Sequence, residues 1–202
     1  MVRIKICGLC DAASAEWAVE SGADMLGFHF CSSQRRVTPE EAKAIVDGLA
    51  VRPKIVGVFI DQDVEEVRQI ADFVDLDMVQ LHGSEAPGFE PGRPVIKVLK
   101  VKGGEIPGAA DWPDPLMLDS WSADQRGGTG RTWDWRLARP LLSTRRVFIA
   151  GGLEPGNVGN VVSAFKPFGV DVSSGVEASV RVKDPDKVRA FIHAVRLAEA
   201  VS

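Results

Sequence analysis

The feature that most constrains the fold of this chain is a regular alternation of short β-branched runs with helix-like stretches. The runs that predict strands lie near residues 2–7, 24–30, 54–60, 76–82, 94–99, 115–119, 146–150 and 169–173. Helical patterns follow most of them, near residues 11–21, 38–49, 63–73, 132–141, 155–165 and 184–199. Asp11, Thr38 and Asp184 stand where N-caps of three of these helices belong. Strands that alternate with helices predict right-handed βαβ units and a parallel sheet.

The number and length of these units predict a particular α/β fold. Eight units in 202 residues average about 25 residues each, which suits a compact (β/α)8 TIM barrel near the lower size limit. The connections at 84–92 and 102–112 are rich in Gly and Pro, and predict short or irregular helices after the fourth and fifth strands. A doubly wound open sheet remains the alternative, because a series of strands does not show closure. Without a linker or composition shift, we expect a single barrel domain over residues 1–202.

Charge and composition exclude several classes of partner. The formal net charge of −4 offers no basic surplus for nucleic acid, although a local anion site needs only a few amides and one Arg. No stretch approaches the roughly 18 apolar residues of a membrane span, and the N-terminus lacks the apolar region of a signal peptide. Three cysteines form an odd and sparse set that favours reduced thiols and a cytoplasmic location.

The alternation of side chains along the strands predicts polar groups inside the barrel. Successive residues of a barrel strand face the lumen and the helices in turn. In the fifth strand, for example, Ile96 and Val98 form the apolar set that we expect to face the helices. In the first, fourth, fifth and sixth strands, this alternation places five side chains in the lumen: Lys5, Cys7, His82, Lys97 and Asp119.

Two glycine-containing segments predict a phosphate site. Gly151 and Gly152 follow the seventh strand and lead into a helix, and Ser173, Ser174 and Gly175 follow the eighth. Glycines let backbone amides approach an anion closely, and the loops after strands seven and eight commonly hold phosphate in such barrels. Tight turns alone would explain either segment, but the pair at this spacing favours phosphate.

Other residues could carry acid–base or redox chemistry. Cys7 and Cys10 have C-x-x-C spacing, which fits a redox pair, half of a zinc site or two inert thiols. No further Cys or His spacing completes a metal site, so we expect no metal and favour one Cys as an acid–base group whose thiolate Lys5 would stabilise. Asp119 closes an apolar strand and could donate a proton if burial raised its pKa. The glycine-rich stretch 126–130 is long enough to close over a ligand.

Together these segments resemble the phosphoribosylanthranilate isomerase family of tryptophan biosynthesis. The matching stretches run from the first strand to the last helix, and the ordered set is specific where each piece alone is not. They are KICGL at 5–9, GAD through GF at 22–28, VGVF at 56–59, VQLHG at 79–83, GGTG at 127–130 with Trp135 behind it, AGGL through NV at 150–158 and VDVSSGVE at 170–177.

The resemblance implies a cofactor-free Amadori rearrangement of a phosphosugar–anthranilate substrate by a monomer or homodimer. Asp119 matches the general acid that opens the furanose ring, and Cys7 the general base that takes the proton from C2 of the sugar. Arg35 matches the arginine expected to pair with the anthranilate carboxylate. The remaining matches are substrate-binding residues and the phosphate site: His82, Gly128, Asp171, Gly151, Gly152, Ser173, Ser174 and Gly175.

Three departures from the family pattern bear on affinity and loop closure. Gln34 replaces a usual Pro and Arg36 follows Arg35, so the carboxylate contact could pass to Arg36. Val180 and Arg181 stand where Pro-Gly is common, and Cys10 where Thr or another small polar residue is usual.

Three other functions stay open. One is a related phosphosugar isomerase such as that of histidine biosynthesis, which would need paired aspartates that Cys7 and Lys97 do not supply. Another is a non-catalytic protein that binds a phosphate ligand. The presence of both Cys7 and Asp119 argues against it. The third is a redox protein that forms a reversible Cys7–Cys10 disulfide.

Overall fold

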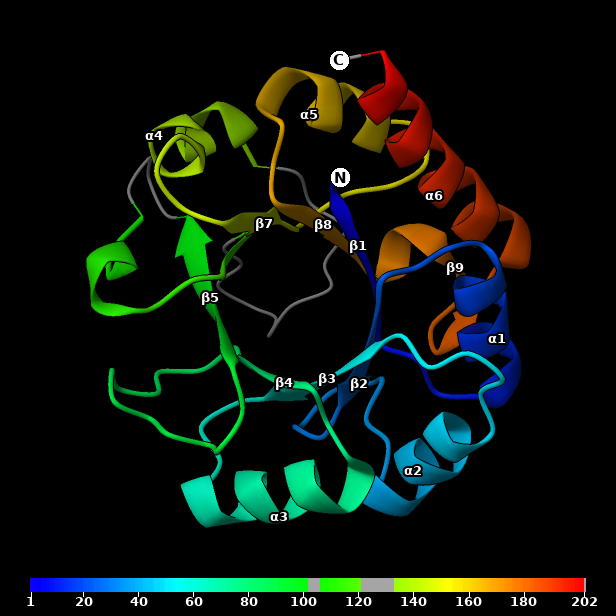
Figure 1. The fold of residues 1–202 in the computed structure, drawn as a ribbon, viewed down its shortest axis with the longest axis vertical. Helices are drawn as coiled ribbons and strands as arrows, with labels where there is room; N and C mark the ends of the chain where they lie inside the picture. Colours follow the sequence, from blue (N-terminus) through cyan, green and yellow to red (C-terminus); the bar gives the residue numbers. More distant parts are fainter. Residues whose placement is uncertain (102–105, 121–132, 202) are drawn as a thin grey trace.

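The chain folds around a closed barrel of eight parallel strands (Figure 1). The computed structural model describes residues 1–101, 106–120 and 133–201. Each strand pairs with the next in sequence, and β8 pairs with β1 through the register Lys5 to Asp171, so the open-sheet alternative is excluded. The barrel strands are β1 (Arg3–Cys7), β2 (Met25–His29), β3 (Lys54–Phe59), β4 (Met78–Leu81), β5 (Val95–Val101), β6 (Leu116–Ser120), β7 (Val147–Ile149) and β8 (Gly169–Val172).

Helices surround the barrel, and their starts follow the predicted capping chemistry. Asp11 accepts the backbone N–H of Ser14, Thr38 forms a capping box with Glu41, and Asp184 caps the last helix. The predicted helix near 132–141 is less regular than expected. Its described part consists of a 3-10 turn, η2 (Trp135–Ala138), followed by a single turn of α-helix, α4 (Arg139–Leu142). The remaining helices are α1 (Ala12–Glu20), α2 (Pro39–Asp47), α3 (Val64–Val74), α5 (Val158–Phe165) and α6 (Pro185–Ala200).

The connections after β4 and β5 are irregular, as predicted. Residues 82–94 contain no helix, and the described part of the next connection holds only the 3-10 turn η1 (Ala109–Asp111). An element that the sequence patterns did not predict follows β8. There a 3-10 turn, η3 (Ser174–Val176), leads into a two-stranded hairpin of β9 (Glu177–Ser179) and β10 (Val182–Lys183).

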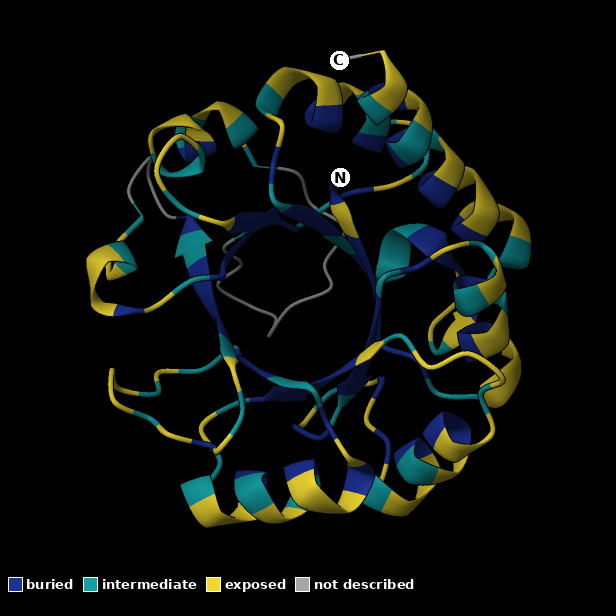
Figure 2. Ribbon diagram, viewed as in Figure 1, coloured by how far each residue is buried: buried dark blue, intermediate teal, exposed yellow. Residues whose placement is uncertain are grey.

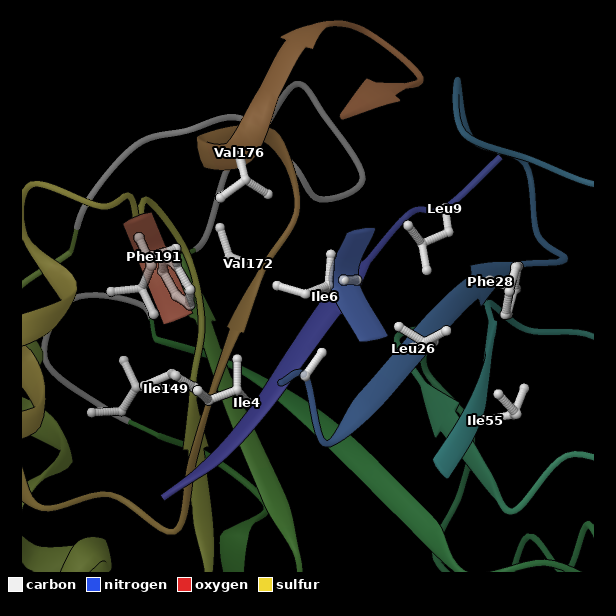
Figure 3. Close-up of a cluster of buried hydrophobic side chains, with 14 of the residues drawn as sticks. Ile4, Ile6, Leu9, Leu26, Phe28, Ile55, Ile149, Val172, Val176 and Phe191 are labelled. Carbon is white, nitrogen blue, oxygen red and sulfur yellow. The ribbon is translucent and has the colours of Figure 1, made fainter. Parts of the chain in front are cut away.

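Apolar side chains form two shells, one outside the strands and one inside. The outer shell joins barrel and helices, with Ile4, Ile6 and Ile149 packed towards Phe191 of α6 (Figure 3). Figure 2 shows the result, with buried strands and exposed outer faces on the helices. The inner shell fills the lumen, as is usual for this fold; its buried members are Met25, Val56, Ile96, Val98, Met117, Phe148 and Ala150.

The inner shell shows that the prediction for the fifth strand was wrong. Ile96 and Val98 face the lumen, and Lys97 points outwards, where its Nζ lies 2.6 Å from Oε2 of Glu85 and 5.0 Å from the ring centre of Trp112. Each face of β5 carries apolar residues and one lysine, Lys97 or Lys100, so alternation alone gave no reliable direction. The buried ion pair with Glu85 satisfies the ammonium group on the outer side.

None of the helices in the described part of the chain combines the length and apolarity needed to cross a bilayer.

Candidate active site

A cavity opens at the carboxyl ends of the strands, where their polar side chains meet. Cys7 ends β1, His29 ends β2, and Asp119 and Asp171 lie near the ends of β6 and β8. Because parallel barrel strands all end on one side, side chains far apart in sequence share this space. Its lining is Cys7, His29, Cys31, Ser33, Arg35, Val58, Ile60, Gln80, His82, Asp119, Asp171 and Ser173.

Asp119 is a buried carboxyl that holds its proton unusually well. Burial raises its pKa to about 6, with the charge of Asp171 adding to the rise and a 2.7 Å hydrogen bond from the N–H of Ser120 opposing it. His82 lies close by, but 3.6 Å separate its Nε2 from Oδ2 of Asp119. Burial and nearby lysines lower the pKa of His82 to about 3, so the imidazole is neutral and the contact is not an ion pair. Asp119 can therefore donate a proton near neutral pH.

Cys7 sits beside a buried cation on its own strand. Burial raises the pKa of its thiol, and the ammonium of Lys5 opposes that rise. Lys5 is fully buried and donates from Nζ to Oδ1 of Asp171 over 2.7 Å. Although burial alone would lower the pKa of Lys5, the carboxylate of Asp171 raises it, so the ammonium stays charged. The thiolate of Cys7 would thus form beside a permanent positive charge.

A second cavity adjoins the first and is bounded by the two glycine-containing segments. Its lining comprises Asp119, Ser120, Ala150, Gly151, Gly152, Leu153, Asp171, Val172, Ser173, Ser174 and Gly175. Asp119, Asp171 and Ser173 line both cavities, so they form one continuous site.

The geometry of this second cavity suits an anion. Gly151 has φ +80° and Gly152 φ +73°, values that residues other than glycine rarely adopt. A Cβ on Gly175 would lie 1.9 Å from the carbonyl oxygen of Leu153, so glycine is required there as well. The Oγ of Ser173 is buried without a hydrogen-bond partner among the described residues. A buried hydroxyl of that kind normally has a partner, which here can be a ligand oxygen.

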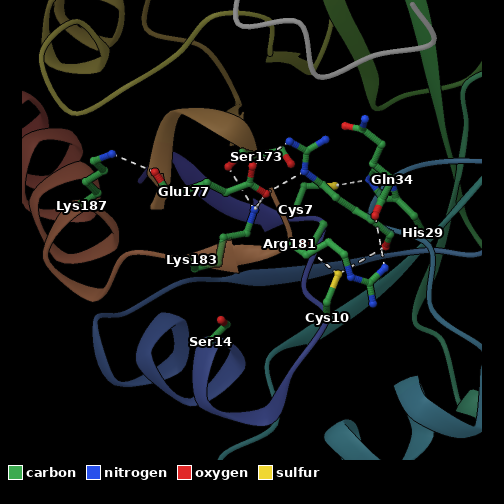
Figure 4. Close-up of polar contacts among 12 residues, drawn as sticks. Cys7, Cys10, Ser14, His29, Gln34, Ser173, Glu177, Arg181, Lys183 and Lys187 are labelled. Carbon is green, nitrogen blue, oxygen red and sulfur yellow. Dashed lines mark hydrogen bonds and ion pairs between the residues drawn. The ribbon is translucent and has the colours of Figure 1, made fainter. Parts of the chain in front are cut away.

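Arg35, in the loop after β2, belongs to a network of buried charges with Glu177 and Lys183 of the hairpin. Figure 4 shows Glu177 and Lys183 side by side. The Nε and Nη2 of Arg35 each donate to the carboxylate of Glu177 over 2.7 Å, and Lys183 donates to the same carboxylate over 3.0 Å. These donors lower the pKa of Glu177, although burial opposes them. The fork of Arg35 is therefore held by Glu177, and its Nη1 is left without a protein partner in the described part of the chain. Arg36 is exposed and does not line the cavity.

The structure brings most of the predicted site residues together. Cys7, Arg35, His82, Asp119 and Asp171 line the first cavity, and the predicted phosphate residues line the second. Gly128, with the whole stretch 126–130, lies outside the described residues.

Several polar residues of this region were not predicted from the sequence, among them His29, Glu177 and Lys183. The alternation that selected Cys7 and Asp119, applied to the second strand, would have found His29. Glu177 and Lys183 belong to the unpredicted hairpin.

The cysteines make contacts of different kinds. In the described part of the chain, none of Cys7, Cys10 and Cys31 forms a disulfide. The Sγ of Cys10 lies 3.7 Å from the carbonyl oxygen of Gly8 and 3.5 Å from that of Arg35, whereas Cys7 contacts His29. Within residues 1–101, 106–120 and 133–201, no three His, Cys, Asp or Glu side chains gather as a metal site would need.

Fold and site together define a (β/α)8-barrel enzyme with buried acid–base groups beside a glycine-lined anion pocket. A family model described as N-(5'phosphoribosyl)anthranilate (PRA) isomerase matches residues 4–194. The chain belongs to this family and is an isomerase of tryptophan biosynthesis.

Individual relatives agree with the family assignment. The N-(5'-phosphoribosyl)anthranilate isomerase of Desulforudis audaxviator is 44% identical over 97% of this chain and 98% of the relative. The crystal structure of phosphoribosyl anthranilate isomerase from Thermus thermophilus superposes with a TM-score of 0.89 at 38% identity, covering 97% of this chain and 99% of that one. Another crystal structure of this enzyme, in complex with reduced 1-(o-carboxyphenylamino)-1-deoxyribulose 5-phosphate, has a TM-score of 0.85 at 35% identity, with the same coverage.

Proposed function

We propose that this chain converts N-(5-phosphoribosyl)anthranilate into 1-(2-carboxyphenylamino)-1-deoxyribulose 5-phosphate, with Cys7 as general base and Asp119 as general acid. The observation that carries this proposal is that Cys7 and Asp119 line one cavity, which continues into the glycine-lined cavity through Asp119, Asp171 and Ser173. A relative that binds a reduced form of the product supports the choice of substrate.

The first step needs an acid, and Asp119 suits it. Its carboxyl protonates the ring oxygen of the ribose, the C1–O bond breaks, and the nitrogen lone pair forms the Schiff base. An acid is most effective when its pKa lies near the working pH, and burial brings that of Asp119 to about 6.

The second step needs a base, and Cys7 suits it. Its thiolate removes the proton from C2, and the electrons of that bond move through C1 to the nitrogen to give the enolamine. Loss of the proton from the C2 hydroxyl and protonation of C1 then complete the ketose. The buried ammonium of Lys5 favours the thiolate that this step uses.

The remaining residues hold the substrate on either side of these groups. The glycine-lined cavity binds the phosphate through backbone amides and the hydroxyl of Ser173. Arg35 meets the anthranilate carboxylate with Nη1, and Asp171 and His82 contact the sugar. Since these residues come from strands between β1 and β8, we propose that the barrel acts as one domain.

Two variants test the acid and the base. Cys7→Ala and Asp119→Asn should each lower kcat by about 10²- to 10⁴-fold, the usual contribution of one acid–base group, in a fluorescence assay of substrate loss. Circular dichroism of each variant controls for folding. Full activity in Cys7→Ala would contradict the assignment of the base.

A further inference from the structure

His29 contacts the proposed base directly and has no part in the reaction described so far. Its Nε2 lies 3.3 Å from the Sγ of Cys7, and its Nδ1 lies 2.9 Å from the Oγ of Ser33. Both contacts are made in the cavity, where Cys7 is buried. Figure 4 shows the imidazole of His29 extending from the end of β2 towards Cys7.

A thiolate at Cys7 selects one tautomer of the imidazole, and the contacts of Ser33 are compatible with it. The Oγ of Ser33 accepts the backbone N–H of Arg35 over 3.1 Å. Because a hydroxyl oxygen has two lone pairs, this contact does not set the direction at His29; a thiolate at Cys7 can only accept, so Nε2 then donates to it and the O–H of Ser33 donates to Nδ1. The proton of the neutral imidazole then sits on Nε2 and points at the sulfur of Cys7.

We propose that His29 is a positioning residue for the base, whose Nε2–H donates a hydrogen bond to the thiolate of Cys7 and so favours and orients that thiolate. This inference rests on the proposed role of Cys7. His29 itself takes up no proton: the proton removed from C2 of the sugar goes to the sulfur, and the imidazole is neutral before and after.

The surrounding charges keep the imidazole neutral. Burial, together with the charges of Lys5, Arg35 and Lys183 and with His82, lowers the pKa of His29 to about 3. The contact is thus a hydrogen bond between a neutral donor and an anion, and differs from a thiolate–imidazolium pair.

Other charged groups around the sulfur also influence the pKa of Cys7, and the effect of His29 adds to theirs. Lys5 on β1 and Lys183 on β10 favour the thiolate, whereas Asp171 on β8 disfavours it. The carboxyl of Asp119 on β6 lines the same cavity. None of these groups changes in a His29 variant.

The pH dependence of Cys7 alkylation isolates this effect. Iodoacetamide reacts with the thiolate, and the rate at Cys7 is followed by mass spectrometry of its peptide, with Cys10 as reference in the same sample. The midpoint of the rate against pH reports the pKa of Cys7, whereas access to the thiol scales only the plateau. Loss of a hydrogen bond to the thiolate should raise the pKa of Cys7, and hence this midpoint, by about one to two pH units.

We expect His29→Leu to move the Cys7 midpoint upward by about one to two units, which makes alkylation at pH 8 about 10- to 100-fold slower. His29→Gln keeps an N–H donor and should restore part of the shift. His193→Leu replaces an exposed histidine on α6 and should change neither thiol. In the enzyme assay, His29→Leu should lower kcat with KM little changed.

The direction in which the Cys7 midpoint moves tests the proposed hydrogen bond. An unchanged midpoint in His29→Leu would overturn it, and so would a lower midpoint, because the latter would mean that Nε2 accepts a hydrogen bond from the thiol. If His29→Leu fails to fold, His29→Phe, which also lacks an N–H donor, takes its place, and an unchanged or lower midpoint there would equally overturn the proposal. Activity of Cys7→Ala is a separate readout: full activity there defeats the role of Cys7, while the alkylation midpoints still judge the His29–Cys7 contact.

Discussion

The ammonium of Lys5 and the carboxylate of Asp171 meet across the seam that closes the barrel. Lys5 on β1 and Asp171 on β8 are register partners, and their Nζ and Oδ1 atoms lie 2.7 Å apart. Lys5 is fully buried, and the same ammonium lies beside Cys7. One ion pair thus joins the first and last strands and sets the charge next to the proposed base.

Lys5→Met should destabilise the fold strongly. The substitution leaves Asp171 without its partner in the lumen, and breaking a buried pair in this way costs about 3–5 kcal/mol. Urea denaturation followed by circular dichroism measures the free energy of unfolding. The double variant Lys5→Met/Asp171→Leu should recover a large part of the loss, since it removes both charges. A loss in the single variant no larger than that of an exposed substitution would show that the pair adds little.

Arg35 and Arg36 should differ sharply in their effect on activity. Arg35 lines the cavity with its fork on Glu177, whereas Arg36 is exposed. Arg35→Lys keeps the charge but loses the planar fork, and should lower kcat/KM by about 10- to 100-fold. Arg36→Lys is the matched control and should stay within about two-fold of the wild type. Equal losses in the two variants would mean that Arg36 shares the carboxylate contact.

Asp119→Asn should change the pH dependence of stability. The unfolded chain releases this proton near about pH 4, and the folded protein near a pKa of about 6. Between these two pH values the unfolded state binds fewer protons than the folded state, so the free energy of unfolding of the wild type falls as pH rises. The whole loss is present once the pH exceeds the folded-state pKa of about 6.

The Asn variant lacks this titration. From pH 4 to pH 7 its stability relative to wild type should therefore rise, by at most about 3 kcal/mol. Urea denaturation of both proteins across this range measures the difference, and other titrating groups cancel. A difference that does not change with pH would show that the pKa of Asp119 is not raised.

Gly175→Ala should disturb the anion pocket. The added Cβ would lie 1.9 Å from the backbone oxygen of Leu153, so one of the two loops must shift. Gly156→Ala is a matched control in the neighbouring loop, because its Cβ would be 3.7 Å from the nearest atom, a side-chain oxygen of Glu154. Binding of inorganic phosphate, measured by calorimetry, should weaken at least about ten-fold in Gly175→Ala and little in Gly156→Ala. Equal affinity in the two variants would place the anion elsewhere.

Much of the fold and of the candidate site was predictable from local patterns. The strands, most helices and three N-caps follow from residue spacing and capping chemistry that act within a few positions. Cys7 and Asp119 also follow, because a lumen-facing residue alternates with apolar neighbours on its own strand. Lys97 shows the limit of that argument, since a strand with apolar residues on both faces carries no direction.

Local sequence patterns were sufficient for the order of the eight barrel strands, for the family and for four of the five side chains predicted to face the lumen: Lys5, Cys7, His82 and Asp119. The folded barrel was needed to show that β8 pairs with β1, that Lys97 turns outwards to Glu85, and that His29 meets Cys7. The difference comes from the sequence separation over which each kind of interaction acts. Capping and periodicity act between residues a few positions apart, whereas ion pairs and hydrogen bonds join atoms that closure of the barrel brings together. Glu177, 142 positions after Arg35, holds its guanidinium for that reason.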